Sequence, residues 1–90
     1  DNMRRIVAAT LDAKLAACVQ VFPVRSFYTW QGERREGGEL RLEFKAKAED
    51  YKDLAAAIRA AHSYETPEIL RLDVAAGDAA YLAWVMQTTR

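Results

Sequence analysis

A strict two-residue alternation over residues 40–47 constrains the fold of this chain more than any other feature. Apolar and charged side chains take turns there, with Leu40, Leu42, Phe44 and Ala46 set against Arg41, Glu43, Lys45 and Lys47. Successive side chains of an extended chain point to opposite faces, so this pattern is typical of a strand with one buried face. The segment therefore predicts a sheet, one face of which lies against the protein interior.

The segments around this strand predict two helices and a second strand. Residues 17–30, rich in Val, Phe and Tyr, predict a long strand. Pro23 within it marks a bend, a bulge or an edge, because proline removes a ladder donor. Residues 31–38 hold glycines on both sides of a charged stretch, which predicts a solvated hairpin turn. Apolar side chains at helical spacing predict helices over residues 3–15 and 50–61.

Two further elements complete the predicted order of helix, strand, strand, helix, strand, helix. Residues 70–74 alternate as another strand, and a last helix follows Gly77–Asp78. This is the order of a ferredoxin-like fold without its first strand. We therefore expect an α+β protein, a ferredoxin-like α/β sandwich with an antiparallel sheet, in one domain over residues 1–90. The absent strand lies in the middle of that sheet, so we expect residues upstream of Asp1, or a neighbouring chain, to fill its place.

The charge and hydropathy of the chain exclude several classes of function. Thirteen basic residues balance thirteen acidic ones without a basic run, which gives no electrostatic footprint for nucleic acid. No apolar stretch approaches the roughly 20 residues that cross a bilayer, and no secretory signal is visible. A single cysteine fits a reducing compartment, so we expect a cytoplasmic protein. Ninety residues make a small domain, for which oligomerisation is a reasonable way to bury more surface.

The residues with the most versatile chemistry lie in two separate segments. His62, the only histidine, shares a loop with Tyr64 and Glu65, and Cys18, the only cysteine, opens a strand. A thiolate with an imidazole suits copper or zinc better than magnesium or calcium. A Cys/His set without fixed spacing is a weak metal motif, however. The alternatives are a buried small Cys18, a structural His62, a packing Tyr64 and a solvated Glu65.

Four segments resemble the CutA family of divalent-cation-tolerance proteins. They are Leu15-Ala-Ala-Cys-Val19, Ser26-Phe-Tyr-Thr-Trp30-Gln-Gly32, His62-Ser-Tyr-Glu65 with Pro67-Glu-Ile69, and Tyr81-Leu-Ala-Trp-Val85. The resemblance implies a PII/CutA-type homotrimer whose long strands extend between subunits, and binding of copper and other divalent ions. The chain departs from the family at two positions, with Gln20 in place of the usual Asn and Ser63 in place of the usual Pro.

The resemblance also implies roles for individual residues. It makes Cys18, His62 and Glu65 candidate ligands of copper(II) or another divalent cation. It places Gln20, Lys47 and Tyr64 at a ligand cleft, although a lysine on the polar face of a strand is most often solvated. Four aromatic side chains exceed what a small monomer buries easily, which predicts a trimer interface, with ordinary core packing as the alternative: Tyr28, Trp30, Tyr81 and Trp84.

These observations lead to one principal hypothesis and two competitors. The principal one is a trimeric, non-enzymatic protein that binds divalent metal, chiefly copper, and serves metal ion tolerance or homeostasis. The second is a PII-like sensor of a small ligand, or a trimeric scaffold, without a direct metal role. An enzyme with Cys18 as nucleophile and His62 as base is disfavoured, because the sequence has neither a nucleophile elbow nor a glycine-rich loop.

Overall fold

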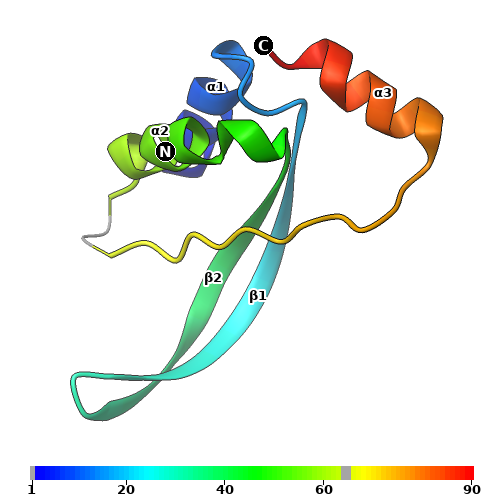
Figure 1. Cartoon of the computed structure of the whole chain (residues 1–90). Coiled ribbons are helices and arrows are strands. Elements are labelled where there is room, and N and C mark those ends of the chain that lie inside the picture. Colours follow the sequence, from blue (N-terminus) through cyan, green and yellow to red (C-terminus); the bar gives the residue numbers. More distant parts are fainter. Residues whose placement is uncertain (1, 64–65) are drawn as a thin grey trace.

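The computed structural model of the chain describes residues 2–63 and 66–90 (Figure 1). It contains, in chain order, α1 (Asn2–Asp12), β1 (Cys18–Trp30), β2 (Glu33–Lys45), η1 (Ala48–Asp50), α2 (Tyr51–Ala61) and α3 (Ala79–Thr88). The three predicted helices and the two strands of the hairpin are therefore confirmed. Among the described residues, no helix is both long and apolar enough to cross a bilayer.

The two strands form a long antiparallel ribbon closed by a two-residue turn. Cys18 pairs with Lys45 at one end of the ribbon and Trp30 pairs with Glu33 at the other. Gln31 has φ 51° and Gly32 has φ 80°. Two positive φ angles are the signature of a type I′ turn, whose twist matches that of the flanking strands. The pairing runs unbroken through Pro23, so this proline lies on an edge strand and marks neither a bulge nor a gap.

The predicted hairpin turn over residues 31–38 was wrong in its extent. Residues 33–38 belong to β2, and the glycines 37 and 38 pair with Ser26 and Arg25. The reason is that β1 is long and extends to Trp30, so β2 has to begin directly after the turn to supply pairing residues for the end of β1. The charged side chains find partners across the ribbon, as Arg25 does with Glu36 at 2.9 Å.

Helices α1 and α2 cover one face of the ribbon near its base (Figure 1). The buried core consists of side chains from both helices and the segment after α1: Ile6, Leu15, Leu54 and Ile58, with Leu42, Phe44, Ala46 and Ile69 packed against them. The apolar face of residues 40–47 thus packs against the core, as the alternation predicts. The distal half of the ribbon extends away from the two helices (Figure 1).

Helix α1 ends in a left-handed residue that turns the chain back toward the sheet. Lys14 has φ 58°, its N–H donates to the Leu11 carbonyl at 3.0 Å, and the Leu15 N–H donates to the Thr10 carbonyl at 3.1 Å. These two bonds make a Schellman motif, which satisfies carbonyls that the helix leaves free. The motif places Leu15 in the core, where its side chain is buried.

The predicted strand over residues 70–74 is not part of a sheet in this chain. The described sheet has two strands, and residues 67–74 run extended without a ladder. Three side chains that the alternation assigned to a buried face are largely exposed: Leu70 75%, Leu72 79% and Val74 73%. An extended segment becomes a strand only when its backbone groups pair with a neighbour, and none of the described residues forms a ladder with this segment.

Candidate functional site

Cys18 is the first residue of β1 and lies at the base of the ribbon. Its thiol is free and half-buried, and it lies opposite Lys45. The neighbouring Ala17 N–H donates to the Lys45 carbonyl at 2.8 Å, which holds this end of the ribbon closed. Since Val19 lies opposite Phe44 of the core-facing side, Cys18 belongs to the other face, away from α1 and α2.

Gln20 shares that outer face with Cys18 and is held by a cross-strand hydrogen bond. The Lys45 ammonium donates to Gln20 Oε1 at 2.8 Å. Lys45 also lies 3.9 Å from Glu43, which in turn lies 3.4 Å from Arg41. The outer face beside the thiol therefore carries Arg41, Glu43 and Lys45 within ion-pair distance of one another along β2. The Gln20 amide accepts a hydrogen bond from the last of them.

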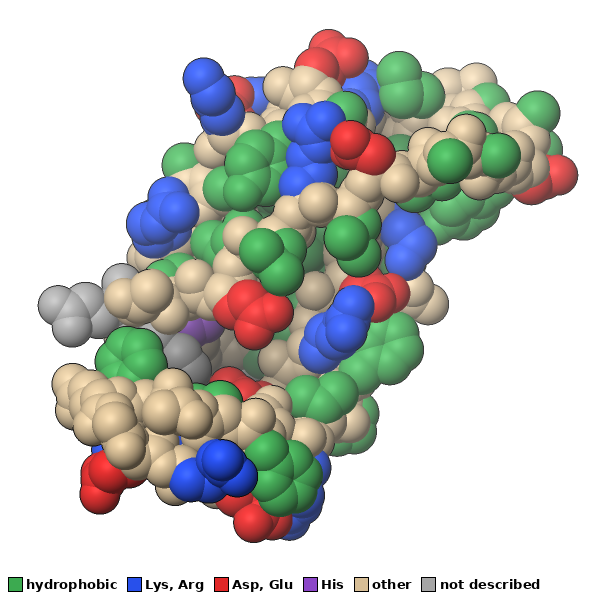
Figure 2. Space-filling model, turned by 60° about the horizontal axis from the view of Figure 1, so that its bottom comes forward, with side chains coloured by type: hydrophobic (Ala, Val, Ile, Leu, Met, Phe, Trp, Pro, Cys, Tyr) green, Lys and Arg blue, Asp and Glu red, His purple; other side chains and the backbone are tan. Residues whose placement is uncertain are grey.

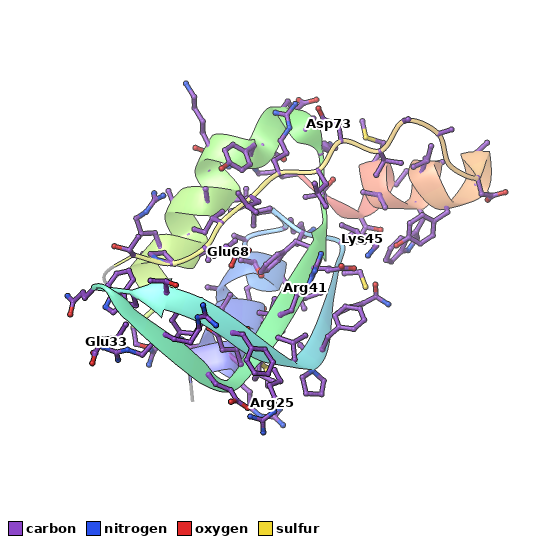
Figure 3. All side chains as sticks on the ribbon, turned by 90° about the horizontal axis from the view of Figure 1, so that it is seen from below. Arg25, Glu33, Arg41, Lys45, Glu68 and Asp73 are labelled. Carbon is purple, nitrogen blue, oxygen red and sulfur yellow. The ribbon has the colours of Figure 1, made fainter. Side chains whose placement is uncertain are left out.

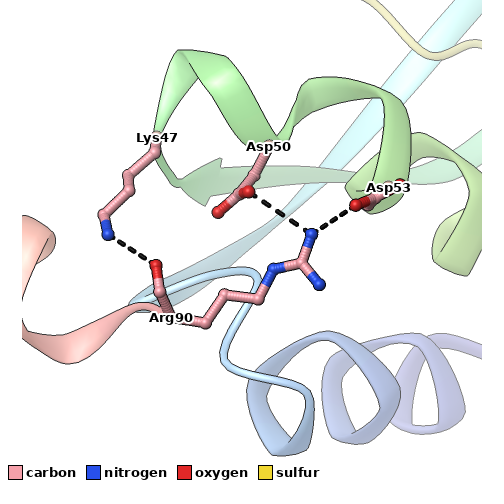
Figure 4. Close-up of polar contacts among 4 residues, drawn as sticks. All are labelled: Lys47, Asp50, Asp53 and Arg90. Atoms are coloured by element: carbon pink, nitrogen blue, oxygen red, sulfur yellow. Dashed lines mark hydrogen bonds and ion pairs between the residues drawn. The ribbon is translucent and has the colours of Figure 1, made fainter.

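Lys47, predicted at a ligand cleft, contacts Arg90 of the same chain in this structure (Figure 4). Its ammonium donates to the Arg90 carbonyl at 2.5 Å. The Arg90 guanidinium forms ion pairs with Asp50 at 3.4 Å and with Asp53, and the hydrogen bond to Asp53 raises the pKa of Arg90. These contacts fasten the segment after α3 to the start of α2. This cluster was not predicted, because the acidic residues of a helix's first turn carry no mark of a distant arginine partner.

His62 immediately follows α2 as its C-cap residue, whereas Cys18 opens β1. Its backbone N–H donates to the Arg59 carbonyl at 3.4 Å, and its side chain is half-buried. The eleven residues of α2 span about 16 Å, whereas Cys18 lies beside the chain that leads into the start of α2. One copy of the chain therefore holds the thiol and the imidazole at different ends of its helical layer.

The other two predicted residues of this loop, Tyr64 and Glu65, lie outside the described residues. Among residues 2–63 and 66–90, no three side chains of the His, Cys, Asp or Glu type are grouped so that they could hold a metal ion. A thiolate and an imidazole remain suitable donors for copper or zinc. A shared site for Cys18 and His62 accordingly needs a contribution from a second copy.

The four predicted interface aromatics are all about half exposed in the single chain. Tyr28 is 45% and Trp30 50% exposed on the distal half of β1, while Tyr81 is 42% and Trp84 43% exposed on α3. The rings of Tyr81 and Trp84 pack against each other, with centroids 5.7 Å apart. Core packing within one chain therefore does not account for these rings.

Two hollows lie between the hairpin and the segment that follows α2. The larger, about 690 Å³, is formed at the distal half of the ribbon by Ser26, Phe27, Tyr28, Trp30, Arg35 and Glu39 together with Thr66 and Glu68. The smaller, about 120 Å³, is formed by Phe44, Lys45 and Ala46 with Leu72, Val74, Tyr81, Leu82 and Val85. The larger hollow combines aromatic rings with charges of both signs, a lining able to take a small polar ligand.

A charged pair, Arg71 and Asp73, lies on the same segment near these hollows. Arg71 donates through Nε to Asp73 at 2.7 Å, and this bond lowers the pKa of the Asp73 carboxyl and raises the pKa of Arg71. The Arg71 guanidinium also lies 6.0 Å from the centre of the Tyr51 ring on α2. The two side chains cancel each other's charge, and the guanidinium contacts α2 through the Tyr51 ring.

Comparison with known proteins gives consistent matches along the chain. Residues 1–88 match the family model of the CutA1 divalent ion tolerance protein. The divalent-cation tolerance protein CutA of Archaeoglobus fulgidus is 33% identical over 88 residues, covering 98% of this chain and 86% of the relative. The CutA of Thermus thermophilus is 39% identical over 87 residues, covering 96% and 84%.

Solved structures match this chain in fold as well as in sequence. CutA1 of Pyrococcus horikoshii (mutation D60A) superposes with a TM-score of 0.95 at 29% identity, covering 99% of this chain and 87% of that one. The A. fulgidus structure, described as a periplasmic divalent cation tolerance protein, gives 0.93 at 33% identity, covering 97% and 85%. A PII-like CutA from Nostoc sp. gives 0.89 at 30%, covering 97% and 86%. With its α+β fold and these matches, the chain belongs to the CutA1 divalent ion tolerance family.

Proposed function

We propose that this chain assembles as a homotrimer that binds divalent metal ions, copper(II) in particular, and acts in metal ion tolerance without catalysing a reaction. The family supplies the link to divalent cations. We place the protein in the cytoplasm, where a free Cys18 stays reduced. The observation that carries the proposal is the large apolar surface that one copy leaves uncovered.

That surface is unusually extensive for a single small chain. Among residues 2–63 and 66–90, fifteen large hydrophobic side chains are at least 37% exposed, against seven buried hydrophobic residues. Figure 2 shows hydrophobic side chains spread between charged ones over one face of the molecule. Monomeric proteins rarely expose contiguous apolar patches beyond a few hundred Å². The ribbon, residues 70–74 and α3 carry nearly all of these side chains, and each suits contact with further copies.

Assembly also supplies what a metal site built from Cys18 and His62 needs. The two side chains lie at different ends of the helical layer in one copy, so a neighbouring copy has to bring a thiol to an imidazole. Glu65 adds a carboxylate in the sequence next to His62. A copper or zinc ion held by sulfur, nitrogen and oxygen donors fits the preferences of these metals.

The hollow of about 690 Å³ favours a second candidate function, a PII-like small-ligand sensor or scaffold. Its aromatic rings offer stacking surfaces, and Arg35 offers a donor for an anionic group, with Glu39 and Glu68 as acceptors. In this alternative the cation effect is indirect. Thermal-shift screening distinguishes the two, because a ligand that binds only the native state raises its stability in proportion to ligand excess.

The direct test is calorimetric titration of copper(II) into reduced, metal-free protein, with the mass measured by light scattering in the same buffer. We expect a trimer mass and saturable binding that weakens at least tenfold in Cys18→Ser and in His62→Gln, because each change removes one donor. Zinc(II), which does not oxidise a thiol, provides a second titration. Lys52→Ser, on the exposed side of α2, is the control.

Two results would contradict the metal proposal. One is binding no tighter than that of an unrelated protein with one histidine and one cysteine. The other is equal affinity in wild type and both donor variants. A trimer mass together with either result would transfer the assignment to the sensor or scaffold.

A further inference from the structure

Arg5, near the start of α1, holds the last backbone carbonyl of α2, directly before His62. Its Nε and Nη2 both donate to the Ala61 carbonyl, at 3.3 and 3.1 Å. Nη2 also donates to Asn2 Oδ1 at 3.0 Å, which orients the guanidinium. Arg5 and Ala61 are 56 positions apart in the sequence. The side chain therefore joins the beginning of one helix to the end of another.

The backbone that carries Arg5 is fixed by core packing. Ile6, the next residue of α1, is buried with Leu54 and Ile58 of α2, and Ala61 packs against the same cluster. The two helices lie side by side over the base of the ribbon (Figures 1 and 3). Because the core holds α1 against α2, the guanidinium presents its donors to the Ala61 carbonyl from a fixed position.

The Ala61 carbonyl belongs to the same peptide unit as the N–H of His62. This N–H donates to the Arg59 carbonyl at 3.4 Å, longer than the usual value of about 2.9–3.0 Å. The last carbonyls of a helix have no partner within it, so a side chain from elsewhere has to supply the donor. The two shorter, charge-assisted bonds from Arg5 therefore contribute most to fixing this peptide unit.

The orientation of that peptide unit decides where His62 leaves the helix. A peptide unit is planar, so a fixed carbonyl also fixes the nitrogen and Cα of the next residue. At His62 the chain changes from helix to extended backbone, with φ −82° and ψ 143°. A rotation of the peptide unit would therefore move the imidazole together with its Cα.

We propose that Arg5 is a positioning residue for His62, which it holds ready to bind a divalent cation, and this role rests on the metal site proposed above. Arg5 does not contact the cation. It restricts the backbone that carries the imidazole, so less conformational freedom is lost when the cation binds. Residues that hold a metal ligand in this way influence affinity without being ligands.

The charge of Arg5 and its hydrogen bonds act on cation binding in opposite directions. A guanidinium near a cation repels it, so loss of the charge alone would strengthen binding. Loss of the anchor on the Ala61 carbonyl weakens binding instead, because His62 is then less well placed. The sign of the change in affinity thus separates positioning from electrostatics.

Zinc(II) titration of the reduced, metal-free protein tests the role. We expect Arg5→Ala to weaken binding about tenfold, the low end of the loss for residues that orient a metal ligand. Arg5→Lys should fall between this variant and the wild type, because an ammonium keeps the charge without the planar fork. Arg59→Ala, which removes an exposed guanidinium from the last turn of α2 and leaves Arg5 in place, is the matched control and should not weaken binding.

A double variant shows whether Arg5 acts through the imidazole. In a His62→Gln background, Arg5→Ala should cause no further loss of zinc affinity, since the residue that it positions is already absent. Light scattering on each variant checks that the mass of the assembly is unchanged.

Amide hydrogen exchange without metal tests the anchor itself. We expect Arg5→Ala to speed exchange at His62 by at least about threefold, while the amides of residues 54–58 exchange as in the wild type. General destabilisation would instead speed exchange along the whole helix.

Three results would overturn the role of Arg5. They are zinc affinity in Arg5→Ala equal to or tighter than that of wild type, the same loss from Arg5→Ala with and without His62, and unchanged exchange at His62. Zinc affinity in His62→Gln equal to that of wild type would overturn the metal site, and the role of Arg5 with it. That variant retains Arg5, so failure of the metal site is recognised separately from failure of the anchor.

Discussion

Replacing Leu70 and Leu72 together by serine tests whether the exposed segment is an assembly surface. In the single chain these side chains are 75% and 79% exposed. Substitutions at exposed positions change the stability of a folded chain by no more than about 0.5 kcal/mol. If residues 70–74 pack against another copy of the chain, the same change removes apolar contacts between the two copies.

The size of that loss follows from the area still available for burial. Complete burial of a leucine side chain is favourable by about 1.5–3 kcal/mol, so three quarters of that value for two leucines is roughly 2–5 kcal/mol for each copy. At about 1.4 kcal/mol for each factor of ten, the association constant falls roughly 30-fold to a few thousand-fold. Urea unfolding of the dissociated chain, by contrast, stays nearly unchanged.

Sedimentation velocity over a dilution series measures this prediction directly. We expect the double variant to dissociate at concentrations where the wild type remains assembled, while Lys52→Ser behaves as the wild type. An unchanged dissociation midpoint in the double variant would show that residues 70–74 lie outside any interface. A wild-type chain that is monomeric at every concentration would refute the assembly itself.

Three further predictions concern the stability of the fold. Ile58→Ala should destabilise the chain by about 2–5 kcal/mol in urea unfolding, because it empties part of the core, while exposed Arg59→Ala should change it by less than about 0.5; equal effects would contradict the assigned core. Asp78→Ala should cost about 0.5–2 kcal/mol, because the carboxylate caps α3, and a melting temperature equal to that of wild type would exclude this role. Arg71 lowers the pKa of Asp73, so the ion pair stabilises the fold above the usual carboxyl pKa range, and this stability is lost as pH falls through the lowered pKa. In Asp73→Asn the loss of stability at acid pH should therefore be slightly smaller than in the wild type. Identical profiles of stability against pH would show that the pair does not contribute.

Local pattern was sufficient for the helices and for the hairpin. The alternation over residues 40–47 predicted the core-facing side of β2, and helical spacing predicted α1 and α2 to within a few residues. Helices and a hairpin form most of their backbone hydrogen bonds between residues close in the sequence or across one turn. The local sequence pattern is therefore enough to predict them. The hairpin turn was predicted too long because residues 33–38 are charged or glycine, which is typical of a turn. These residues are polar because the distal ribbon is solvated, and they belong to strand β2.

The site was predictable as chemistry and unpredictable as geometry. Cys18 and His62 stay predicted donors for copper or zinc: a thiolate and an imidazole suit these metals, and the resemblance to the family selects these two residues. The place of Lys47 at a ligand cleft likewise stays a prediction, while the fold brings the Arg90 carbonyl to its ammonium. The pairing of residues 43 positions apart depends on how α3 returns to α2, which no local pattern encodes.

Residues 70–74 separate what the sequence determined from what the tertiary structure decided. Their alternation determined an extended conformation, because it follows from side-chain direction along a single chain. Whether that extension becomes a strand depends on a partner that supplies backbone donors and acceptors from elsewhere in space. Among the described residues, no strand of the sheet pairs with this segment, so Leu70, Leu72 and Val74 remain exposed.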